Sequence, residues 1–225
     1  MEMINIKINN LPLQVESGTR IIDAAKQLGI DIPHLCYFPD QEIKAHCRIC
    51  MVEVTGSRKL LAARSTVCWE GMEVFTTTQK VHDAQVGVLE MILANHNQDC
   101  LNCPRNGNCE LQTLCSRFNL TKPNMLHDFD TTPIQDSNPS LIRDMSKCVK
   151  CGRCARICLE NQGVAALTYS GRSENFAVTT AFRKPFETTD CVLCGQCSTV
   201  CPVGPSWRRM IPRKSGTLSM TTANT

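Results

Sequence analysis

The first part of the chain alternates between apolar and polar positions and then changes to a helical period. Residues Ile4 to Asn9 alternate, as do Leu11 to Val15, and the pair Asn9-Asn10 between them suits a turn. This pattern predicts a β-hairpin. Apolar residues then recur at helical spacing between Thr19, which we expect to cap the helix, and Gly29, which should end it. The chain is therefore expected to open with a hairpin followed by a helix.

Five later stretches also have patterns that predict secondary structure. Met51 to Val54 and Leu60 to Ala63 predict two further strands. Val81 to Asn95 has apolar positions at helical spacing and predicts an amphipathic helix. Ala165 to Tyr169 and Phe176 to Thr180 predict a short hairpin. We therefore expect an α+β protein.

Composition changes this picture through its cysteines. A chain of 225 residues could form one or two ordinary domains, but 16 Cys and 5% aromatic residues fit small modules organised by metal clusters. The N-terminus lacks the pattern of a signal peptide, and no apolar run approaches membrane-spanning length, so we expect metal binding in a reducing, cytoplasmic environment. The net charge of +3 is too small and scattered to indicate nucleic-acid binding.

Two similar cysteine runs give the strongest chemical signal. Each follows C-x2-C-x2-C-x3-C, the spacing by which bacterial ferredoxins hold two 4Fe-4S cubanes. Three closely spaced thiolates bind one cubane, and the fourth Cys of each run reaches the other cubane. Zinc has no use for the third and fourth Cys of such a run. The predicted ligand sets are Cys148, Cys151, Cys154 and Cys201 for one cubane, and Cys191, Cys194, Cys197 and Cys158 for the other.

Four further cysteines follow the predicted hairpin and helix. A hairpin and a helix followed by cysteines resemble the opening of a β-grasp ferredoxin. Four thiolates suit a 2Fe-2S cluster, with two for each iron. Ten residues separate the first two, Cys36 and Cys47, where the plant-type spacing has four, so zinc competes with iron at this site. The β-grasp pattern and the neighbouring clusters favour iron. His34 and His46 flank the site as surface or hydrogen-bonding residues, and the ligands are Cys36, Cys47, Cys50 and Cys68.

The end of the predicted Val81–Asn95 helix leads into a mixed ligand set. The spacing H-x3-C-x2-C-x5-C supplies one imidazole and three thiolates, from His96, Cys100, Cys103 and Cys109. A neutral imidazole in place of a thiolate removes one negative charge, which should make a cluster easier to reduce. Zinc bound by the same four residues remains an alternative. Cys115 is left over, and we interpret it as a small buried apolar residue.

The order of these motifs resembles the N-terminal iron–sulfur module of NAD(P)-linked, electron-bifurcating FeFe-hydrogenase catalytic subunits. The large iron–sulfur subunit of NADH dehydrogenase (complex I) and some NAD-dependent formate dehydrogenases share this module. The segment Arg143 to Cys148 and the stretch Gln162 to Val164 look most like the hydrogenase branch, and the resemblance covers Ile4 to Gly204. It implies a 2Fe-2S cluster on the first four cysteines and a 4Fe-4S cluster on His96 and its three cysteines.

The resemblance also implies a division into domains. We expect a β-grasp 2Fe-2S ferredoxin domain at 1–79 and a small helical 4Fe-4S domain, with one His and three Cys as ligands, at 80–119. A connector at 120–140 leads to a bacterial-type ferredoxin domain with two clusters at 141–204, and an irregular tail occupies 205–225.

The expected function is electron transfer, because no nucleotide-binding glycine motif, Walker A motif or nucleophile–base arrangement is present. The chain would relay single electrons in an NAD(P)H-linked, ferredoxin-coupled complex. FMN and NAD(P) would bind a partner iron–sulfur subunit, and a small 2Fe-2S subunit and soluble ferredoxin are further expected partners. We expect no catalytic centre on this chain. A scaffold with structural zinc sites is an alternative of another class.

The sequence after Gly204 departs from the hydrogenase pattern, and the cysteines of a catalytic H-cluster domain are absent. A reading frame shifted at Gly204 would give a sequence closer to the hydrogenase linker, which makes a truncated hydrogenase subunit a second alternative. A natural disordered tail is the simpler interpretation. The coding DNA distinguishes the two.

Overall fold

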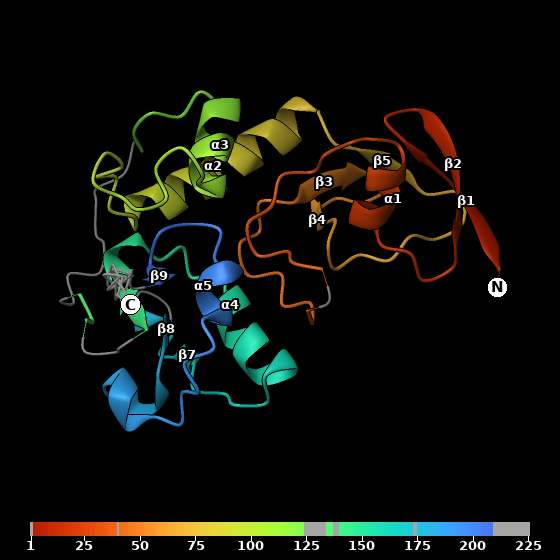
Figure 1. The fold of residues 1–225 in the computed structure, drawn as a ribbon. Helices are drawn as coiled ribbons and strands as arrows, with labels where there is room; N and C mark the ends of the chain where they lie inside the picture. Colours follow the sequence, from red (N-terminus) through yellow and green to blue (C-terminus); the bar gives the residue numbers. More distant parts are fainter. Residues whose placement is uncertain (1, 40, 124–133, 137–139, 173–174, 209–225) are drawn as a thin grey trace, which may run out of the picture.

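The computed structural model describes residues 2–39, 41–123, 134–136, 140–172 and 175–208. Its N-terminal part is a five-stranded mixed sheet in the order β2-β1-β5-β3-β4 (Figure 1). In this sheet β1 pairs antiparallel with β2 and parallel with β5. The strands are β1 (Met3–Ile8), β2 (Leu11–Glu16), β3 (Met51–Val54), β4 (Leu61–Ala62) and β5 (Glu73–Phe75).

The alternating pattern places one face of the first hairpin in the core. Ile4, Ile6 and Ile8 are buried, while the residues between them are exposed. Asn9 and Asn10 both have left-handed φ angles, of 49° and 67°, which asparagine tolerates and which a two-residue hairpin turn requires. The predicted hairpin is therefore confirmed. The strand β5 was not predicted.

Helix α1 (Ile21–Gln27) covers this sheet, since its apolar side chains share one buried core with the strands. Its N-cap is Arg20, whose side chain makes no capping bond, so the prediction of a Thr19 cap is wrong by one residue. Thr19 instead accepts a backbone hydrogen bond from Cys68 at 2.8 Å. Gly29 directly follows the C-cap residue Leu28. Its φ of 71° is left-handed, as expected for the glycine that was predicted to end the helix.

Two helices follow the sheet in the chain and lie beside it, along the top of the view in Figure 1. Helix α2 (Gln79–Ala94) confirms the predicted amphipathic helix, and Thr78 caps it by accepting a hydrogen bond from the Val81 amide. Gln85 donates to the Met51 carbonyl at 3.1 Å and so links α2 to β3. Helix α3 (Glu110–Arg117), which was not predicted, packs with α2 in a second core.

The part of the chain that holds the two cysteine runs, described from residue 140 to 208 apart from 173–174, is called the two-run unit. It is built from short elements. Strand β6 (Leu141–Arg143) pairs with β9 (Ser206–Arg208), and the predicted hairpin is present as β7 (Thr168–Ser170) and β8 (Ala177–Thr179). The remaining pieces are helices α4 (Arg153–Arg156) and α5 (Gln196–Thr199), a π-helical turn η2 (Ile157–Asn161), and the 3-10 turns η1 (Met145–Lys147), η4 (Ala181–Arg183) and η5 (Phe186–Thr188).

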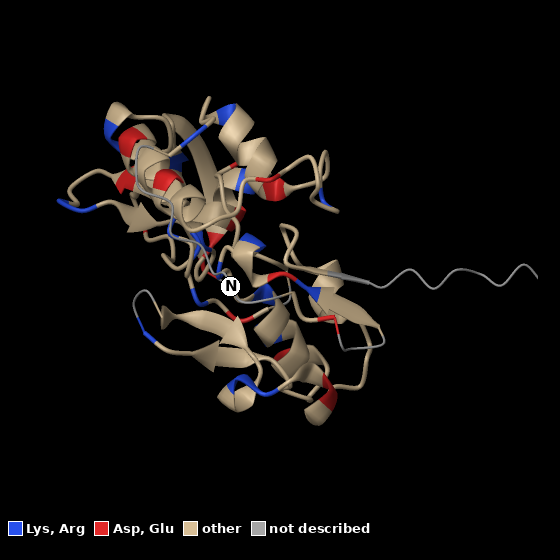
Figure 2. Cartoon of the chain, turned by 90° about the vertical axis from the view of Figure 1, so that its left-hand side faces the viewer, with Lys and Arg blue, Asp and Glu red and all other residues tan. Residues whose placement is uncertain are grey.

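The irregular tail predicted from residue 205 is corrected at its beginning, because Ser206–Arg208 forms a strand with Leu141–Arg143. Residues after 208 and most of the predicted connector lie outside the described residues. Among the described helices, none combines the length and apolarity that crossing a bilayer requires. Basic and acidic residues are interspersed over the chain (Figure 2). The mixed sheet with short helical units agrees with the predicted α+β class.

Candidate metal centres

Loops next to the sheet supply the four cysteines of the first site. Cys36, Cys47 and Cys50 lie between α1 and β3, and Cys68 lies between β4 and β5. All four are buried. The thiol of Cys47 lies 3.4 Å from the sulfur of Cys36. Cys50 interacts electrostatically with Cys36 and shares a core with Cys68. The structure thus brings Cys36, Cys47 and Cys50 near one another, and Cys68 belongs to the same apolar core as Cys50.

The charges around Cys36 favour its thiolate. The hydrogen bond from Cys47 lowers the pKa of Cys36 to about 4, and the positive charge of Arg64 contributes to this effect. The same hydrogen bond and burial raise the pKa of Cys47. Burial raises the pKa of Cys68 to about 11. A buried thiolate is costly without a neighbouring cation, so the remaining thiols suit ligands whose negative charge a bound metal offsets.

The two histidines beside this site have other partners. His34 Nδ1 lies 2.8 Å from the carbonyl oxygen of Ile32. The ring of His46 makes edge contacts with Tyr169 and Phe176, at centroid distances of 5.2 and 6.1 Å.

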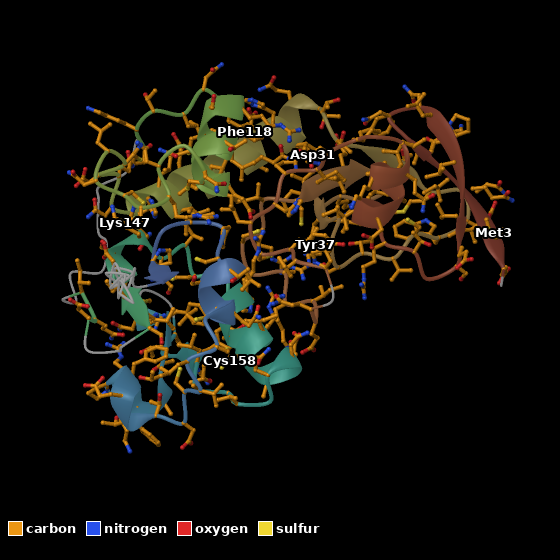
Figure 3. All side chains as sticks on the ribbon, in the orientation of Figure 1. Met3, Asp31, Tyr37, Phe118, Lys147 and Cys158 are labelled. Atoms are coloured by element: carbon orange, nitrogen blue, oxygen red, sulfur yellow. The ribbon has the colours of Figure 1, made fainter. Side chains whose placement is uncertain are left out.

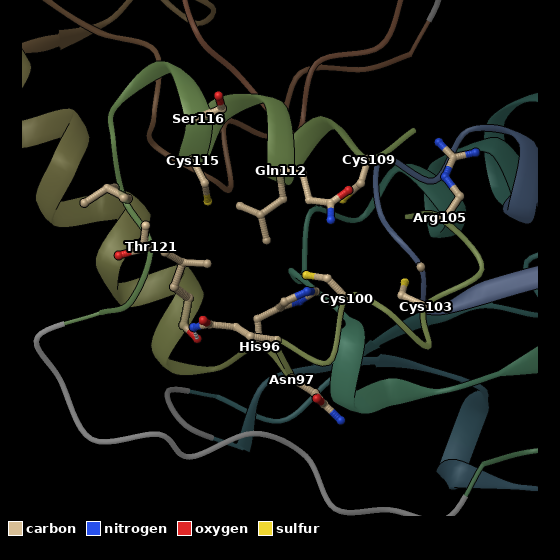
Figure 4. Close-up of a pocket in the computed structure, with 15 residues that line it drawn as sticks. His96, Asn97, Cys100, Cys103, Arg105, Cys109, Gln112, Cys115, Ser116 and Thr121 are labelled. Atoms are coloured by element: carbon tan, nitrogen blue, oxygen red, sulfur yellow. Dashed lines mark hydrogen bonds between the residues drawn. The ribbon is translucent and has the colours of Figure 1, made fainter. Parts of the chain in front are cut away.

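The second site is a cavity of about 290 Å³ at the end of α2. All four predicted ligands, His96, Cys100, Cys103 and Cys109, line it, and Figure 4 shows their side chains around one space. His96 follows α2 directly, and Cys109 is the N-cap of α3. The two helices therefore position opposite sides of the cavity.

His96 has the chemistry of a neutral metal ligand. Its side chain is buried, and burial together with the positive charge of Lys147 lowers its pKa to about 4. Its Nδ1 atom has no hydrogen-bond partner within the described part of the chain. A buried nitrogen without a partner is costly in free energy, and coordination to iron would satisfy it.

Gly204 lies against this cavity. A Cβ atom at Gly204 would be 2.6 Å from Cys103 Sγ, which is closer than any normal contact. The absence of a side chain at this position therefore leaves room for the Cys103 sulfur. The leftover residue Cys115 lines the same cavity, and burial raises the pKa of its thiol to about 11. The spacing of residues in the sequence did not indicate that Gly204 and Cys115 would border this cavity.

The two cysteine runs adopt the same local backbone conformation. Lys150 and Leu193, each two residues after the first Cys of its run, have φ angles of 53° and 58°. Gly152 and Gly195 have φ angles of 75° and 72° and precede the short helices α4 and α5. Such left-handed residues turn successive amides toward one side of a loop, an arrangement that suits an anionic cluster. The repeat in sequence is therefore a repeat in structure.

The structure brings each fourth cysteine to the opposite run. Cys201 is buried, and its electrostatic neighbours are Cys151, Cys154 and Cys148. Cys158 follows α4 (Figure 3) and lines a pocket together with three cysteines of the second run, namely Cys191, Cys194 and Cys197. Burial raises the pKa of Cys151 to about 12 and of Cys197 to about 11. At these two buried positions a bound cation would offset the cost of forming the thiolate.

No group of three or more His, Cys, Asp or Glu side chains in the described ranges is gathered closely enough for a single metal ion. The assignment of ligands to clusters therefore rests on spacing, on the shared cavities and on the electrostatics of the thiols.

A common core connects the three units. Cys36 and Cys47 from the sheet unit, Leu111 from α3, and Cys151 and Cys201 from the two-run unit belong to one buried cluster. Arg153 of α4 binds the Glu110 carboxylate of α3 with two hydrogen bonds, of 2.7 and 2.8 Å. Candidate ligands of the first, second and third sites along the chain thus border one apolar region, whereas Cys158, Cys191 and Cys197 belong to a separate buried cluster.

Three family models match successive parts of the chain. Residues 1–79 match a 2Fe-2S iron–sulfur cluster binding domain, and residues 85–124 match the NADH-ubiquinone oxidoreductase-G iron–sulfur binding region. Residues 147–204 match a 4Fe-4S dicluster domain. Together they account for each of the candidate sites in the order in which the chain presents them.

Curated relatives match most of this chain. It is 39% identical over 209 residues to NADP-reducing hydrogenase subunit HndD of Solidesulfovibrio fructosivorans, covering 91% of this chain and 36% of that protein. An NADH-quinone oxidoreductase subunit of Rhizobium meliloti (strain 1021) is 37% identical, with coverage of 90% and 24%. The NADH-ubiquinone oxidoreductase 75 kDa subunit of Reclinomonas americana is 34% identical, with coverage of 90% and 29%. The chain thus spans about a third or less of these relatives.

A solved structure extends the likeness to three dimensions. The fold matches a chain in the crystal structure of an NAD+-reducing [NiFe]-hydrogenase in the H2-reduced state, with a TM-score of 0.85 and 25% sequence identity. The match covers 94% of this chain and 90% of that one.

Proposed function

Because the chain is homologous to the N-terminal iron–sulfur region of these hydrogenase and NADH-quinone oxidoreductase subunits, we propose that it is an electron-transfer subunit of an NAD(P)H-linked oxidoreductase complex. It would hold one 2Fe-2S and three 4Fe-4S clusters. Such clusters accept and release single electrons, and a plant-type 2Fe-2S site works at about −400 mV. The chain's own residues bind these groups, exclude water from them and set their potentials.

The shared apolar core is the observation that carries this proposal. Ligand candidates of the 2Fe-2S site, of the His-ligated site and of the first cubane, here Cys36, Cys109 and Cys151, border one packed region. Electron transfer needs neighbouring centres held at fixed separation, and a continuous core supplies that rigidity. Separate structural zinc modules would not need a common core.

The two-run unit supplies a path away from this core. Cys201 joins the first-cubane set within the shared core, whereas Cys158 and Cys191 lie beside a different buried cluster. Cys194 of the second set is exposed. We propose that electrons from the 2Fe-2S and His-ligated sites meet at the first cubane and leave through the second, near Cys194.

The proposed donor is a flavin- and NAD(P)-binding iron–sulfur subunit, assisted by a small 2Fe-2S subunit, in a reducing cytoplasmic compartment. The proposed acceptor is ferredoxin or another redox subunit, and electron bifurcation at the donor's flavin is the finer form of this role. The test is anaerobic purification of the native complex followed by addition of NADH or NADPH. We expect co-purifying flavoprotein and bleaching of this chain's visible absorbance. A complex without flavoprotein, or no bleaching although dithionite bleaches the same sample, would overturn the proposal.

A further inference from the structure

Two buried arginines from different units meet at one ligand candidate. Arg64 lies in the sheet unit and is 0% exposed, and Arg156 lies on α4 of the two-run unit and is 2% exposed. Both guanidinium groups donate to the carbonyl oxygen of Cys36, and the Arg156 bond measures 2.7 Å. Arg64 also donates to the Cys36 sulfur at 3.3 Å. Two like charges thus converge on one cysteine.

The same arginines hold the long loop between Cys36 and Cys47. The carbonyl oxygen of Glu42, within this loop, accepts hydrogen bonds from Arg156 at 2.6 Å and from Arg64 at 3.5 Å. The Glu42 amide donates to the carboxylate of Glu160 at 2.9 Å. The ten-residue spacing that departs from plant-type ferredoxins is therefore accommodated by contacts with the neighbouring unit.

Neither arginine has a carboxylate partner within ion-pair distance among the described residues. Buried cations are costly unless an anion lies nearby. The sulfur of Cys36, which would be a thiolate as a metal ligand, is the side-chain acceptor that Arg64 contacts. A 2Fe-2S cluster with four thiolates carries net negative charge, so its presence would supply the missing counter-charge for both guanidinium groups.

We propose that Arg64 and Arg156 are positioning residues that set the potential of the 2Fe-2S cluster, and that the two-run unit supplies Arg156. The inference rests on the proposed function. One-electron reduction adds one negative charge to the cluster and its thiolates, and no bond or proton need change. Nearby positive charge stabilises the reduced form more than the oxidised form and raises the potential. Docking of the two units thereby makes the 2Fe-2S site easier to reduce.

Arg156 also contacts the first cysteine run, because its Nε donates to the carbonyl oxygen of Gly152 at 3.4 Å. Cys36 and Cys151 interact electrostatically, which places the 2Fe-2S and first-cubane ligands close to one another. One guanidinium can thus lower the repulsion between two anionic clusters that exchange an electron.

The experiment is a dithionite titration of the full chain, purified anaerobically and followed by electron paramagnetic resonance. We expect Arg64→Gln and Arg156→Gln to lower the 2Fe-2S midpoint potential while its signal intensity is retained, and Arg156→Lys to return it toward wild type. Arg143→Gln is the matched control. Arg143 is buried but faces Cys154 and Cys197, so this variant should leave the 2Fe-2S potential unchanged.

Unchanged 2Fe-2S potentials in the loaded glutamine variants would overturn the inference, although the proposed function would stand. If the glutamine variants bind no 2Fe-2S cluster, the lysine variants Arg64→Lys and Arg156→Lys decide. Lysine variants that hold the 2Fe-2S cluster with a midpoint potential near that of wild type would support the role of positive charge. A lowered midpoint potential in the lysine variants, or their failure to bind the cluster, would overturn the inference. Absence of any 2Fe-2S signal in the wild-type chain would instead overturn the proposed function.

Discussion

Gly204 and Cys103 lie so close together that a Cβ atom at Gly204 would be only 2.6 Å from the Cys103 sulfur. This close approach joins the chain just after the second cysteine run to Cys103, a proposed ligand of the His96 site. A free Cys103 side chain could rotate away from a new methyl group, but a metal-bound thiolate could not. The close approach therefore matters most when the cluster is present.

The first prediction is that Gly204→Ala selectively weakens the cluster at His96, Cys100, Cys103 and Cys109. The expected result is loss of one 4Fe-4S cluster, or of its characteristic resonance signal, with the other clusters retained. Iron and sulfide analysis with paramagnetic resonance measures it. Gly87→Ala is the control, because Gly87 lies within α2 and has open space around its Cβ position. It should keep every cluster and stabilise the helix by about 0.5–1 kcal/mol. Full cluster content in Gly204→Ala would contradict the prediction.

The second prediction concerns His96 as a proposed ligand. His96→Cys should retain the cluster but lower its midpoint potential, since a thiolate adds a negative charge where the imidazole is neutral. His96→Ala should lose the cluster. A redox titration and iron analysis provide the measurement. His82→Ala, on the exposed side of α2, is the matched control and should change neither quantity. A potential in His96→Cys equal to or above wild type would argue against ligation by His96.

The third prediction tests the link between α3 and α4. Arg153 is 4% exposed and Glu110 is 43% exposed at their side chains, and two hydrogen bonds join them. Arg153→Gln should destabilise the folded chain by about 1–3 kcal/mol, because charge-assisted hydrogen bonds in a buried setting are lost. Thermal unfolding under argon measures the change. Arg117→Gln removes the exposed pair with Asp31 and should cost under about 1 kcal/mol. Equal effects of the two substitutions would contradict the account.

The fourth prediction is a pH dependence at Tyr169. Burial raises the pKa of its phenol to about 12, and its hydroxyl group donates to the Gly152 carbonyl at 3.3 Å. The folded state thus favours the neutral phenol. The contribution of Tyr169 to the free energy of unfolding is fully present below the pKa of about 10 that the phenol has in the unfolded chain. It is lost as the pH rises from there through the pKa in the folded state.

Chemical unfolding of wild type and Tyr169→Phe across this range checks the sign. The stability of wild type relative to the variant should be constant below about pH 9 and should fall above about pH 10. A difference that grows in favour of wild type above that pH would contradict the burial of the neutral phenol.

The sequence predicted those parts of the fold that local patterns determine. Alternation identified β1 and β2, helical spacing identified α2, and the Cys spacings pointed to cysteines that line two of the cavities. Short elements were missed where tertiary contacts decide. Helix α3 carries few apolar residues, and β9 exists only through its pairing with β6.

The surroundings of the sites were less predictable for the same reason. Arg156 contacts Cys36 across 120 positions of sequence, and Gly204 meets Cys103 through the return of the chain after the second cysteine run. Neither contact has a local signature. Cys115 was expected to be only a buried apolar residue, and its place in the His96 cavity depends on how α3 packs.

The most direct test of the central claim is the metal content of the chain purified anaerobically, combined with native mass spectrometry and Mössbauer spectroscopy. The account predicts a brown protein whose mass exceeds that of the polypeptide by one 2Fe-2S and three 4Fe-4S clusters, with no stoichiometric zinc. A colourless chain that binds zinc at these cysteines, and that shows no absorbance change on reduction, would contradict the electron-transfer role.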